Sequence, residues 1–246
     1  MTPHLRYPLG LLLSLLTCSL FAQSHFKPED TEFYTPKPPV VTVTNTIPSD
    51  AIILFNGVDL SKWESSTTPG AAAPWTVNNN ILTVKPSSGN IQTKDKFDDF
   101  QLHIEWQSPL VVKGNGQGRG NSGIFLQGLY ELQVLDNQDN PTYTNGQAGS
   151  IYKQRPPLVE ARVAPQGWHT YDILYTAPRF NKDGMLISKA RVTVLHNGIV
   201  VQLNTEIEGT TEYIGLPQLK AHGAGPIILQ DHGDLVNYRN IWLRRL

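Results

Sequence analysis

The chain alternates apolar and polar residues over many short stretches, which is the pattern of half-buried β-strands. In the stretch from 100 to 107, Leu102 and Ile104 occupy one parity, and His103 and Glu105 occupy the other. Successive side chains of a strand point to opposite faces, so this stretch predicts a strand with one buried face. No stretch repeats its apolar residues every three to four positions for long enough to predict a long helix.

More than ten such strands follow one another at short spacing, with Asn-Gly turns at 56–57 and 197–198 that are typical of hairpins. The expected strands include residues 51–55, 75–77, 81–84, 91–93, 100–107, 167–175, 191–196, 199–204, 227–230 and 237–243, with two more between 119 and 136. Many short strands joined by turns predict an all-β fold in which two antiparallel sheets form a sandwich.

The stretch from Arg119 to Asp136 reads RGNSGIFLQGLYELQVLD and predicts two strands joined at Gly128. Glu131 and Gln133 share one parity of the second strand. On the first strand, one face carries Asn121, Gly123, Phe125 and Gln127. Amides and a carboxylate beside glycines favour a surface that hydrogen-bonds a polyhydroxylated ligand. An ordinary solvated face of an antiparallel sheet is the alternative, and this stretch alone leaves both open.

The same strand offers a single carboxylate on its polar face. Glu131 is followed by Gln133 and Leu135 at the next two positions of equal parity, whereas Asp136 has the opposite parity. Ordinary glycosidases use two carboxyl groups, about 5–5.5 Å apart for retention or about 6.5–9.5 Å apart for inversion. The pattern therefore disfavours ordinary glycoside hydrolysis by this strand.

Composition narrows the class of partner. The chain has 246 residues and a formal net charge of -1, with no long basic run, so nucleic acid is not expected as a partner. The glycine-rich loop from Lys113 to Gly120 lacks the spacing of a phosphate-binding loop and is not followed by a helical pattern. A turned loop at the rim of a site is the expected role for this segment.

The N-terminus predicts an export signal over residues 1–22. Arg6 precedes the apolar stretch Leu9 to Phe21, and Ala22 offers a small residue for cleavage. The apolar stretch is too short for a comfortable membrane span. Cys18, the single cysteine, would be removed with this segment unless it is lipidated, which is the one case in which membrane contact is expected. We expect a periplasmic or extracellular protein, with a lipoprotein as the alternative.

The rest of the chain divides into a proline-rich arm or linker over residues 23–50 and one domain over residues 51–246. Within the domain six motifs carry a resemblance: LFNG at 54–57, DFQLHIEW at 99–106, GNSGI at 120–124, YELQVLD at 130–136, LQDHG at 229–233 and RNIW at 239–242. In this order they resemble the 3-keto-disaccharide hydrolase family, over the whole domain. The resemblance implies a jelly-roll sandwich similar to the concanavalin A-like lectins and glucanases, with a sugar site on its concave sheet.

The resemblance also implies activity on glycosides whose glucosyl C3 hydroxyl has been oxidised to a ketone. Such a ketone acidifies the hydrogen on C2, so one base can remove it and the C1 substituent can leave by elimination. Water can then add to the enone, which gives a net hydrolysis. The route needs a base, a group that stabilises the enolate and an acid for the leaving oxygen.

His232 is the best candidate for the base, because histidine changes charge near neutral pH. Asp231 or Asp234 would orient it, and a turn histidine without a catalytic role is the alternative. Glu131 is expected to act as acid or base, unless it is a buried carboxylate paired with Arg119 or Arg239.

Further residues are expected to bind the substrate. Asn121, Gln133 and Gln230 would recognise hydroxyl groups, and Arg119 would face the enolate or ketone oxygen. The full expected set is Glu105, Arg119, Asn121, Gln133, Asp136, Trp168 and Gln230. His169 follows Trp168 where family members more often carry an amide, which adds a second titratable group and leaves the identity of the base open.

A divalent metal remains open as a cofactor, since His103 and Glu105 share a strand face and would need a third ligand such as Glu131. The expected partner is a small-molecule carbohydrate, and the sequence leaves the oligomeric state undetermined. Two other functions also remain open at this point. One is a non-catalytic carbohydrate-binding module on the same sandwich, and the other is a hydrolase of ordinary glycosides.

Overall fold

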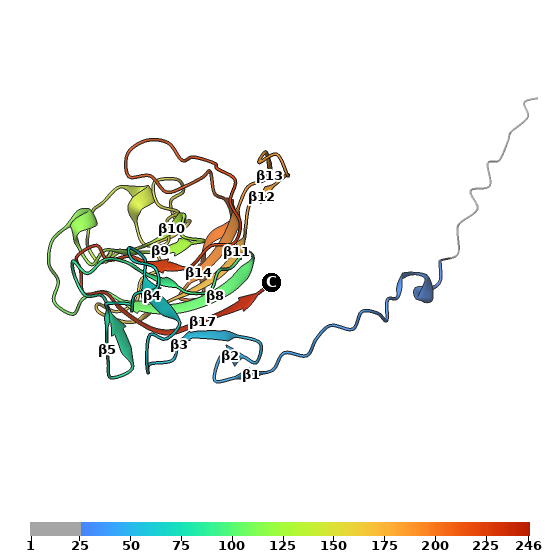
Figure 1. The fold of residues 1–246 in the computed structure, drawn as a ribbon, viewed down its shortest axis with the longest axis horizontal. Helices are drawn as coiled ribbons and strands as arrows, with labels where there is room; N and C mark the ends of the chain where they lie inside the picture. The colour runs from blue at the N-terminus through green and yellow to red at the C-terminus, as the bar shows by residue number, and fades with distance from the viewer. Residues whose placement is uncertain (1–25) are drawn as a thin grey trace, which may run out of the picture. The chain divides into compact units, whose positions relative to one another are not determined.

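The computed structural model describes residues 26–246, and β-strands dominate this part of the chain (Figure 1). The expected export signal at residues 1–22, with Cys18 and the cleavage point, lies outside the described residues. The chain divides into two units, Met1–Val40 and Val41–Leu246. In the described part of the first unit, a short 3-10 helix, η1, spans Pro28–Thr31, and every residue is exposed. Among the described residues, no helix is long and apolar enough to span a membrane.

Two antiparallel sheets make up most of the second unit. The smaller has the strand order β10–β9–β16–β7–β4. Its strands are β10 (Tyr130–Val134), β9 (Ser122–Leu126), β16 (Ile228–Leu229), β7 (Ile91–Thr93) and β4 (Trp63–Ser65). The larger has the order β15–β14–β11–β8–β17–β6–β5, with β3 paired to β17. Its strands are β15 (Ile199–Glu206), β14 (Arg191–His196), β11 (His169–Thr176), β8 (Phe100–Gln107), β17 (Asn237–Arg245), β6 (Ile81–Thr83), β5 (Thr76–Asn78) and β3 (Ile52–Phe55).

Two small hairpins and two further 3-10 turns complete the described chain. They are β1 (Val43–Thr44) with β2 (Ile47–Pro48), β12 (Arg179–Phe180) with β13 (Leu186–Ser188), η2 (Gly116–Gly118) and η3 (Thr144–Gly146). The predicted all-β, two-sheet antiparallel sandwich is confirmed. Most of the expected strands are present to within one or two residues, whereas β4 and the β12–β13 hairpin were not expected.

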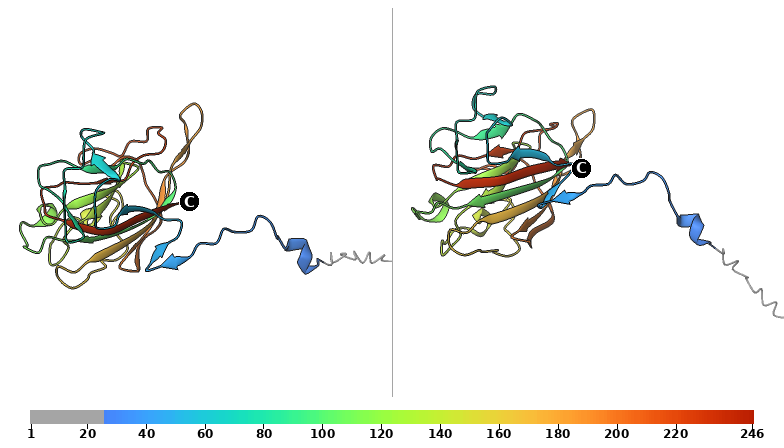
Figure 2. Two further views of the ribbon diagram at one scale, coloured as in Figure 1. Left: turned by 60° about the horizontal axis from the view of Figure 1, so that its bottom comes forward. Right: turned by 90° about the horizontal axis from the view of Figure 1, so that it is seen from below.

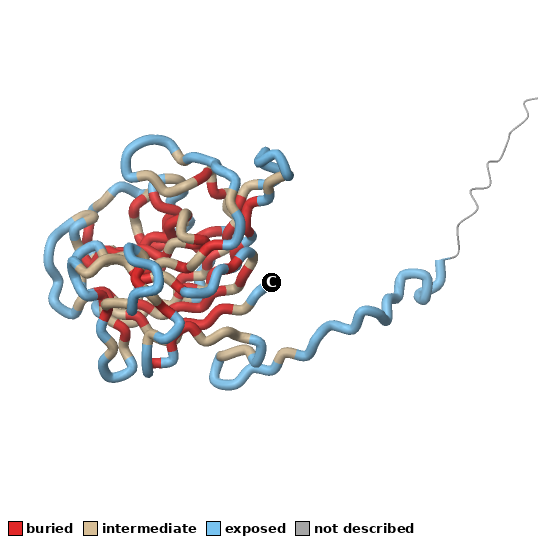
Figure 3. The backbone as a smooth tube through the Cα atoms, viewed as in Figure 1, coloured by how far each residue is buried: buried red, intermediate tan, exposed pale blue. Residues whose placement is uncertain are grey.

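The core lies between the two sheets, because each sheet turns its apolar parity inward. In β8 the residues Leu102, Ile104 and Trp106 are fully buried, and β11 and β17 flank this strand on either side (Figure 2). In the smaller sheet, Ile124 and Leu132 are equally buried. The buried segments gather inside the sandwich, and exposure concentrates in the loops (Figure 3).

Buried tyrosines of the larger sheet tie it to the strands of the smaller one. Tyr171 donates through its hydroxyl to the backbone oxygen of Gln133 at 2.9 Å. Tyr238 donates to Oγ of Ser122 at 2.7 Å, and this hydroxyl donates in turn to the backbone oxygen of Gln230 at 2.6 Å. Each such bond contributes about 0.5–1.5 kcal/mol and also restricts where β9, β10 and β16 lie. These three strands carry the candidate site.

Candidate active site

A cavity of about 240 Å³ lies on the outer face of the smaller sheet. The residues that line it are Asn121, Phe125, Glu131, Gln133, Tyr152, Thr211, Tyr213, Gln230 and His232. Drug-sized ligands occupy pockets of about 300–1,000 Å³, so this cavity suits one small, ring-sized polar molecule. We call it the main cavity.

The floor of the main cavity comes from three hydrogen-bonded strands. Glu131 is paired across the sheet with Phe125, and Gln133 with Gly123. Gln230 follows β16 directly, and its backbone N–H donates to the backbone oxygen of Gly123 at 3.0 Å. The carboxyl of Glu131 and the amides of Gln133 and Gln230 therefore lie around the position of Gly123.

Gly123 is required for the place that the Glu131 carboxyl takes. A Cβ atom at position 123 would lie 2.4 Å from Oε1 of Glu131 and 3.0 Å from its Cδ. Such contacts are far closer than van der Waals distance, so any side chain here would push the carboxyl away. The glycine therefore leaves a hollow in the sheet that the carboxyl of Glu131 fills.

Glu131 is buried and has no cationic partner among the described residues. Only 4 % of it is exposed, and its burial raises the pKa of its carboxyl to about 8. The two arginines considered as partners bind other carboxylates: Arg119 pairs with Asp136 at 2.9 Å, and Arg239 with Glu105 at 2.6 Å. At neutral pH Glu131 is therefore mostly protonated and can donate a hydrogen bond.

The amides beside Glu131 have unused hydrogen-bonding capacity. Oε1 of Gln230 is buried and has no hydrogen-bond partner among the described residues. Buried polar atoms are almost always paired, so this oxygen is suited to accept from a bound ligand. The amide of Gln133 fits its surroundings when its nitrogen donates to Oε1 of Glu131 at 3.2 Å and to the backbone oxygen of Ser122 at 3.0 Å. Asn121 donates to the backbone oxygen of Gln117 at 2.7 Å. These bonds hold both amides at the floor.

One wall of the main cavity comes from two loops that cover the free edge of β10. The backbone N–H of Tyr152 donates to the backbone oxygen of Glu131 at 3.0 Å, and the backbone N–H of Glu131 donates to Oγ1 of Thr211 at 2.9 Å. The hydroxyl of Tyr152 lies 2.5 Å from that of Tyr143. Burial raises the pKa of Tyr152, so its phenol stays protonated. The mutual bond uses one of the two hydroxyl protons, and the other is free for a ligand.

His232 lies at the opposite rim, on the loop after β16. Its side chain is exposed, and its ring has no hydrogen-bond partner within residues 26–246. Asp231 does not orient this ring. Its Oδ2 accepts from the backbone N–H groups of Ser88 and Gly89 at 2.9 and 3.0 Å. Asp231 thus anchors the loop that presents His232, because it ties that loop to its neighbour.

The alternative orienting residue, Asp234, is also engaged elsewhere. Its Oδ2 accepts from the backbone N–H of Asn121 at 2.8 Å. Asp234 thus links the loop of His232 to the start of β9. Neither of the two aspartates expected to orient the histidine contacts it in this structure.

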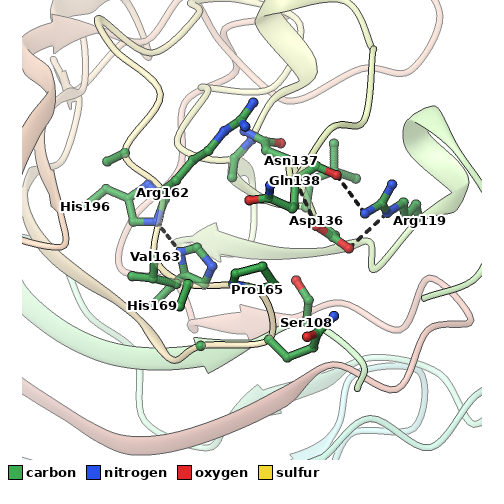
Figure 4. A pocket seen from close by; sticks show the side chains of 16 residues that line it. Ser108, Arg119, Asp136, Asn137, Gln138, Arg162, Val163, Pro165, His169 and His196 are labelled. Atoms are coloured by element: carbon green, nitrogen blue, oxygen red, sulfur yellow. Dashed lines mark hydrogen bonds and ion pairs between the residues drawn. The ribbon is translucent and has the colours of Figure 1, made fainter. Parts of the chain in front are cut away.

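Four residues expected at the site lie elsewhere, and two of them line a separate small cavity. This cavity has a volume of about 40 Å³ and contains Arg119, Asp136, His169 and His196 (Figure 4). Strand β10 ends at Val134, so Asp136 lies beyond it, and its carboxylate pairs with Arg119. The ion pair places both residues outside the main cavity, which corrects the expectation that they meet the substrate there.

The histidines of the small cavity are neutral. Nδ1 of His169 lies 2.8 Å from Nε2 of His196. Burial lowers the pKa of His169 to about 4 and that of His196 to about 3. His169 also stacks on Trp106, with ring centroids 4.0 Å apart. The additional histidine therefore adds no titratable group to the main cavity.

Glu105 lies in β8 of the larger sheet, and Trp168 immediately precedes β11 of that sheet. Glu105 alternates with the buried residues of β8, so it lies on the outer face of that sheet, where it accepts from Arg239 and from Asn240. The guanidinium of Arg239 covers the ring of Trp168 at 4.0 Å. The sandwich core separates this face from Glu131, so the expectation that the two residues bind the same substrate is corrected.

The core of the sandwich also separates the three residues that the sequence offered as possible metal ligands. His103 and Glu105 lie in β8, and Glu131 lies in β10 of the other sheet. Nδ1 of His103 instead contacts Oδ1 of Asp172 at 2.7 Å. Within residues 26–246, no group of three or more His, Cys, Asp or Glu side chains is placed to hold a metal ion.

Comparison with known proteins places the chain in a family. Residues 50–244 match the 3-keto-alpha-glucoside-1,2-lyase-like domain. The chain belongs to this family. A 3-keto-disaccharide hydrolase from Bacteroides thetaiotaomicron is 26% identical over an alignment of 254 positions, and the match covers 81% of this chain and 81% of that protein.

Solved structures of related proteins agree with the fold. A candidate glycosyl hydrolase from Parabacteroides distasonis has 56% identity and a TM-score of 0.87, and the match covers 91% of this chain and 98% of that one. A second candidate glycosyl hydrolase from the same organism has 20% identity and a TM-score of 0.59, covering 80% and 94%. The second likeness supports the sandwich fold alone.

Four residues that line the main cavity were not predicted from the sequence as site residues. They are Phe125, Tyr152, Thr211 and Tyr213. Phe125 has the same parity as Asn121, so its strand face was predicted although its place in the site was not. The other three come from loops, which have no periodic pattern to show which sheet face they cover.

Proposed function

We propose that this protein cleaves 3-keto-glucosides by elimination across C1 and C2, followed by hydration of the enone. The observation that carries the proposal is Glu131, a single buried carboxyl whose pKa is raised to about 8, in a cavity that also contains His232. Among the described residues that line this cavity, Glu131 is the only one with a carboxyl group. Two-carboxylate hydrolysis lacks its second group there, whereas elimination next to a ketone does not need it.

In this mechanism His232 is the base. Its imidazole takes the proton from C2, and the electron pair of the C2–H bond moves toward the C3 carbonyl to form an enolate. The place of His232 at the open rim, on a loop anchored by Asp231, allows it to approach a ring that rests on the floor of the cavity.

Glu131 stabilises the enolate as a neutral acid. A protonated carboxyl donates a hydrogen bond to the C3 oxygen, and this bond strengthens as negative charge develops there. Ketosteroid isomerase uses a carboxyl kept neutral by an apolar site in the same way. Burial of Glu131 in the hollow over Gly123 supplies the required protonation at neutral pH.

The enolate then collapses. The C3 carbonyl re-forms, a double bond forms between C1 and C2, and the C1–O bond breaks. The leaving oxygen takes the proton held by the imidazolium of His232, which lies next to the carbon that was deprotonated. Water adds to C1 of the enone and a proton returns to C2, so the net reaction is hydrolysis to the 3-keto sugar and the free alcohol.

Amide and hydroxyl groups around the floor of the main cavity bind the sugar hydroxyls. The unpaired Oε1 of Gln230 accepts from a sugar hydroxyl, and the free proton of the Tyr143–Tyr152 pair donates to another. Such paired contacts distinguish a hydroxylated ring from an apolar one, because an unfilled site leaves buried polar atoms unsatisfied.

The test compares wild type with His232→Ala and Glu131→Gln on a 3-keto-disaccharide and on the same disaccharide without oxidation. We expect wild type to cleave only the oxidised substrate. Removal of a general base lowers kcat by about 10²–10⁴-fold, and this loss is expected for His232→Ala. Full activity in both variants would refute the assignment of the site, and release of glucose from the unoxidised disaccharide would favour an ordinary glycosidase.

We also propose that the protein is exported. The support is the sequence of residues 1–22, with its apolar stretch and the small residue Ala22. N-terminal sequencing of the processed protein separates the two forms. A mature chain that begins at Gln23 supports a free secreted protein, and a lipid-modified N-terminal Cys18 supports a lipoprotein.

A further inference from the structure

A second, apolar groove lies beside the loop that carries His232. Its volume is about 490 Å³, and its walls include Pro109, Leu110, Val111 and Leu235. Leu110 is 67 % exposed, Val111 is 68 % exposed and Leu235 is 53 % exposed. Exposed apolar side chains that gather in one place mark binding surfaces more often than scattered ones do. We call this feature the side groove.

The loop after β16 contributes residues to both the main cavity and the side groove. His232 lines the main cavity, and the next two residues, Gly233 and Asp234, line the side groove. Asp234 also accepts from the backbone N–H of Asn121, which lines the main cavity. A ligand that extends past His232 out of the main cavity therefore enters the side groove.

This inference rests on the proposed function, because the reaction determines which part of the substrate extends that way. His232 acts at C2, and C1 is bonded to C2. The leaving group is attached to C1 through an oxygen, and this oxygen is two bonds from C2, the carbon that faces His232. The other neighbour, C3, carries only the ketone oxygen.

We propose that the side groove binds the leaving group of the substrate, and that this protein prefers 3-keto-glucosides whose leaving alcohol is apolar, with an alkyl or aromatic body. The aliphatic side chains offer such a body a surface to bury. Of the polar residues that also line the groove, Thr83 donates to Asn237, and Asp234 accepts from the backbone of Asn121. These groups therefore have fewer hydrogen bonds left for a second sugar, and Lys113 is the one cation among the described residues that line the groove. A preference of about 10–200-fold in kcat/KM is the range that a small difference in apolar contact provides.

The test uses two 3-keto-α-glucosides whose leaving alcohols have similar acidity, methanol and 1-hexanol, so that a rate difference reports binding and not leaving-group chemistry. We expect wild type to prefer the hexyl compound by at least tenfold in kcat/KM. The double variant Leu110→Ser with Val111→Ser should lose most of this preference and retain its rate on the methyl compound. These two side chains are exposed, so the fold should tolerate the change.

The matched control replaces exposed apolar residues that line neither cavity. Met185, just before β13, is 62 % exposed, and Ile187, within β13, is 69 % exposed. The variant Met185→Ser with Ile187→Ser should keep the full hexyl preference.

Four results would overturn the proposal, and they are distinguishable. Equal kcat/KM of wild type for the two glucosides, or a preference that survives in the groove variant, refutes the apolar subsite and leaves the proposed reaction intact. A groove variant that changes from dimer to monomer in sedimentation identifies the surface as a contact between copies of this chain and also refutes it. Absence of turnover of both compounds by wild type refutes the proposed reaction, and the inference fails with it.

Discussion

Replacement of Glu131 by glutamine is expected to stabilise the protein at neutral pH. Burial raises the pKa of the Glu131 carboxyl to about 8, compared with an ordinary value of 4.5. Between these two pH values the folded protein holds a proton that the unfolded chain releases. Stability from this residue is therefore complete below pH 4.5, decreases as pH rises and is lost by about pH 8.

The size of the stability change follows from the difference between the two pKa values of Glu131, about 8 in the folded protein and 4.5 in the unfolded chain. Each pKa unit corresponds to about 1.4 kcal/mol, so the loss is about 0.7 kcal/mol at pH 5 and about 3 kcal/mol at pH 7. Glutamine has nearly the same shape and does not ionise. Glu131→Gln should therefore exceed wild type in free energy of unfolding by these amounts, and at pH 7 its Tm should be higher by roughly 6–12 °C for a domain of this size.

Urea unfolding followed by tryptophan fluorescence at pH 5, 6, 7 and 8 measures this difference. Glu105→Gln is the matched control with the opposite sign. Burial tends to raise the pKa of Glu105, but hydrogen bonds from Asn240 and Arg239 outweigh it, so the pKa lies below its ordinary value. This control should destabilise the protein at pH 7. A stability difference for Glu131→Gln that stays constant between pH 5 and 8 would refute the buried, protonated carboxyl.

Three further substitutions test the geometry of the site. Gly123→Ala places a methyl group where the Glu131 carboxyl lies, so we expect at least a tenfold lower kcat and a loss of about 1–3 kcal/mol in stability, measured by kinetics and urea unfolding. Gln230→Ala should raise KM by about two- to tenfold with little change in kcat, the effect of one lost hydrogen bond of about 0.5–1.5 kcal/mol; an unchanged KM would mean that its free oxygen meets no substrate. Trp168→Ala, under Arg239 on the far sheet, should leave kcat/KM within twofold of wild type, and a tenfold loss would move the site to that face.

The strand pattern alone predicted which residues of the main cavity's floor share a face within each strand. Alternation placed Glu131 and Gln133 on one face of their strand and Asn121 on one face of the strand before it, and the structure brings all three to one cavity. The same rule predicted Leu102 and Ile104 as core residues. Alternation succeeds here because strand geometry is local: it depends on residue parity and not on what lies across the sheet.

The residues placed wrongly show the limit of that rule. Glu105 has a polar outward parity like that of Glu131, but its strand belongs to the other sheet, and parity does not say which outer face a strand presents. Arg119 and Asp136 flank the two site strands in sequence and bind each other instead of the cavity. The position of Glu105 depends on which strands pair into a sheet, and the positions of Arg119 and Asp136 depend on the ion pair between them. Short sequence patterns encode neither of these contacts.

The loop residues required the folded structure for a different reason. Tyr152 reaches the site because its segment pairs with the free edge of β10, and Thr211 because its hydroxyl accepts from the backbone of Glu131. Both contacts join residues from loops without any repeat. The protonation of Glu131 likewise depends on burial under these loops, which the sequence does not display.

Deuterium incorporation at C2 tests the central claim most directly. The protein would turn over a 3-keto-disaccharide in D2O, and the 3-keto-glucose released at early times would be compared with the same sugar kept in D2O without protein, which corrects for spontaneous exchange next to the ketone. The elimination route predicts deuterium at C2 in nearly every enzymatic product molecule, because the proton that returns there comes from solvent or from an exchanged His232. Product that retains the original hydrogen at C2 would contradict elimination and show that the glycosidic bond is cleaved without an enolate.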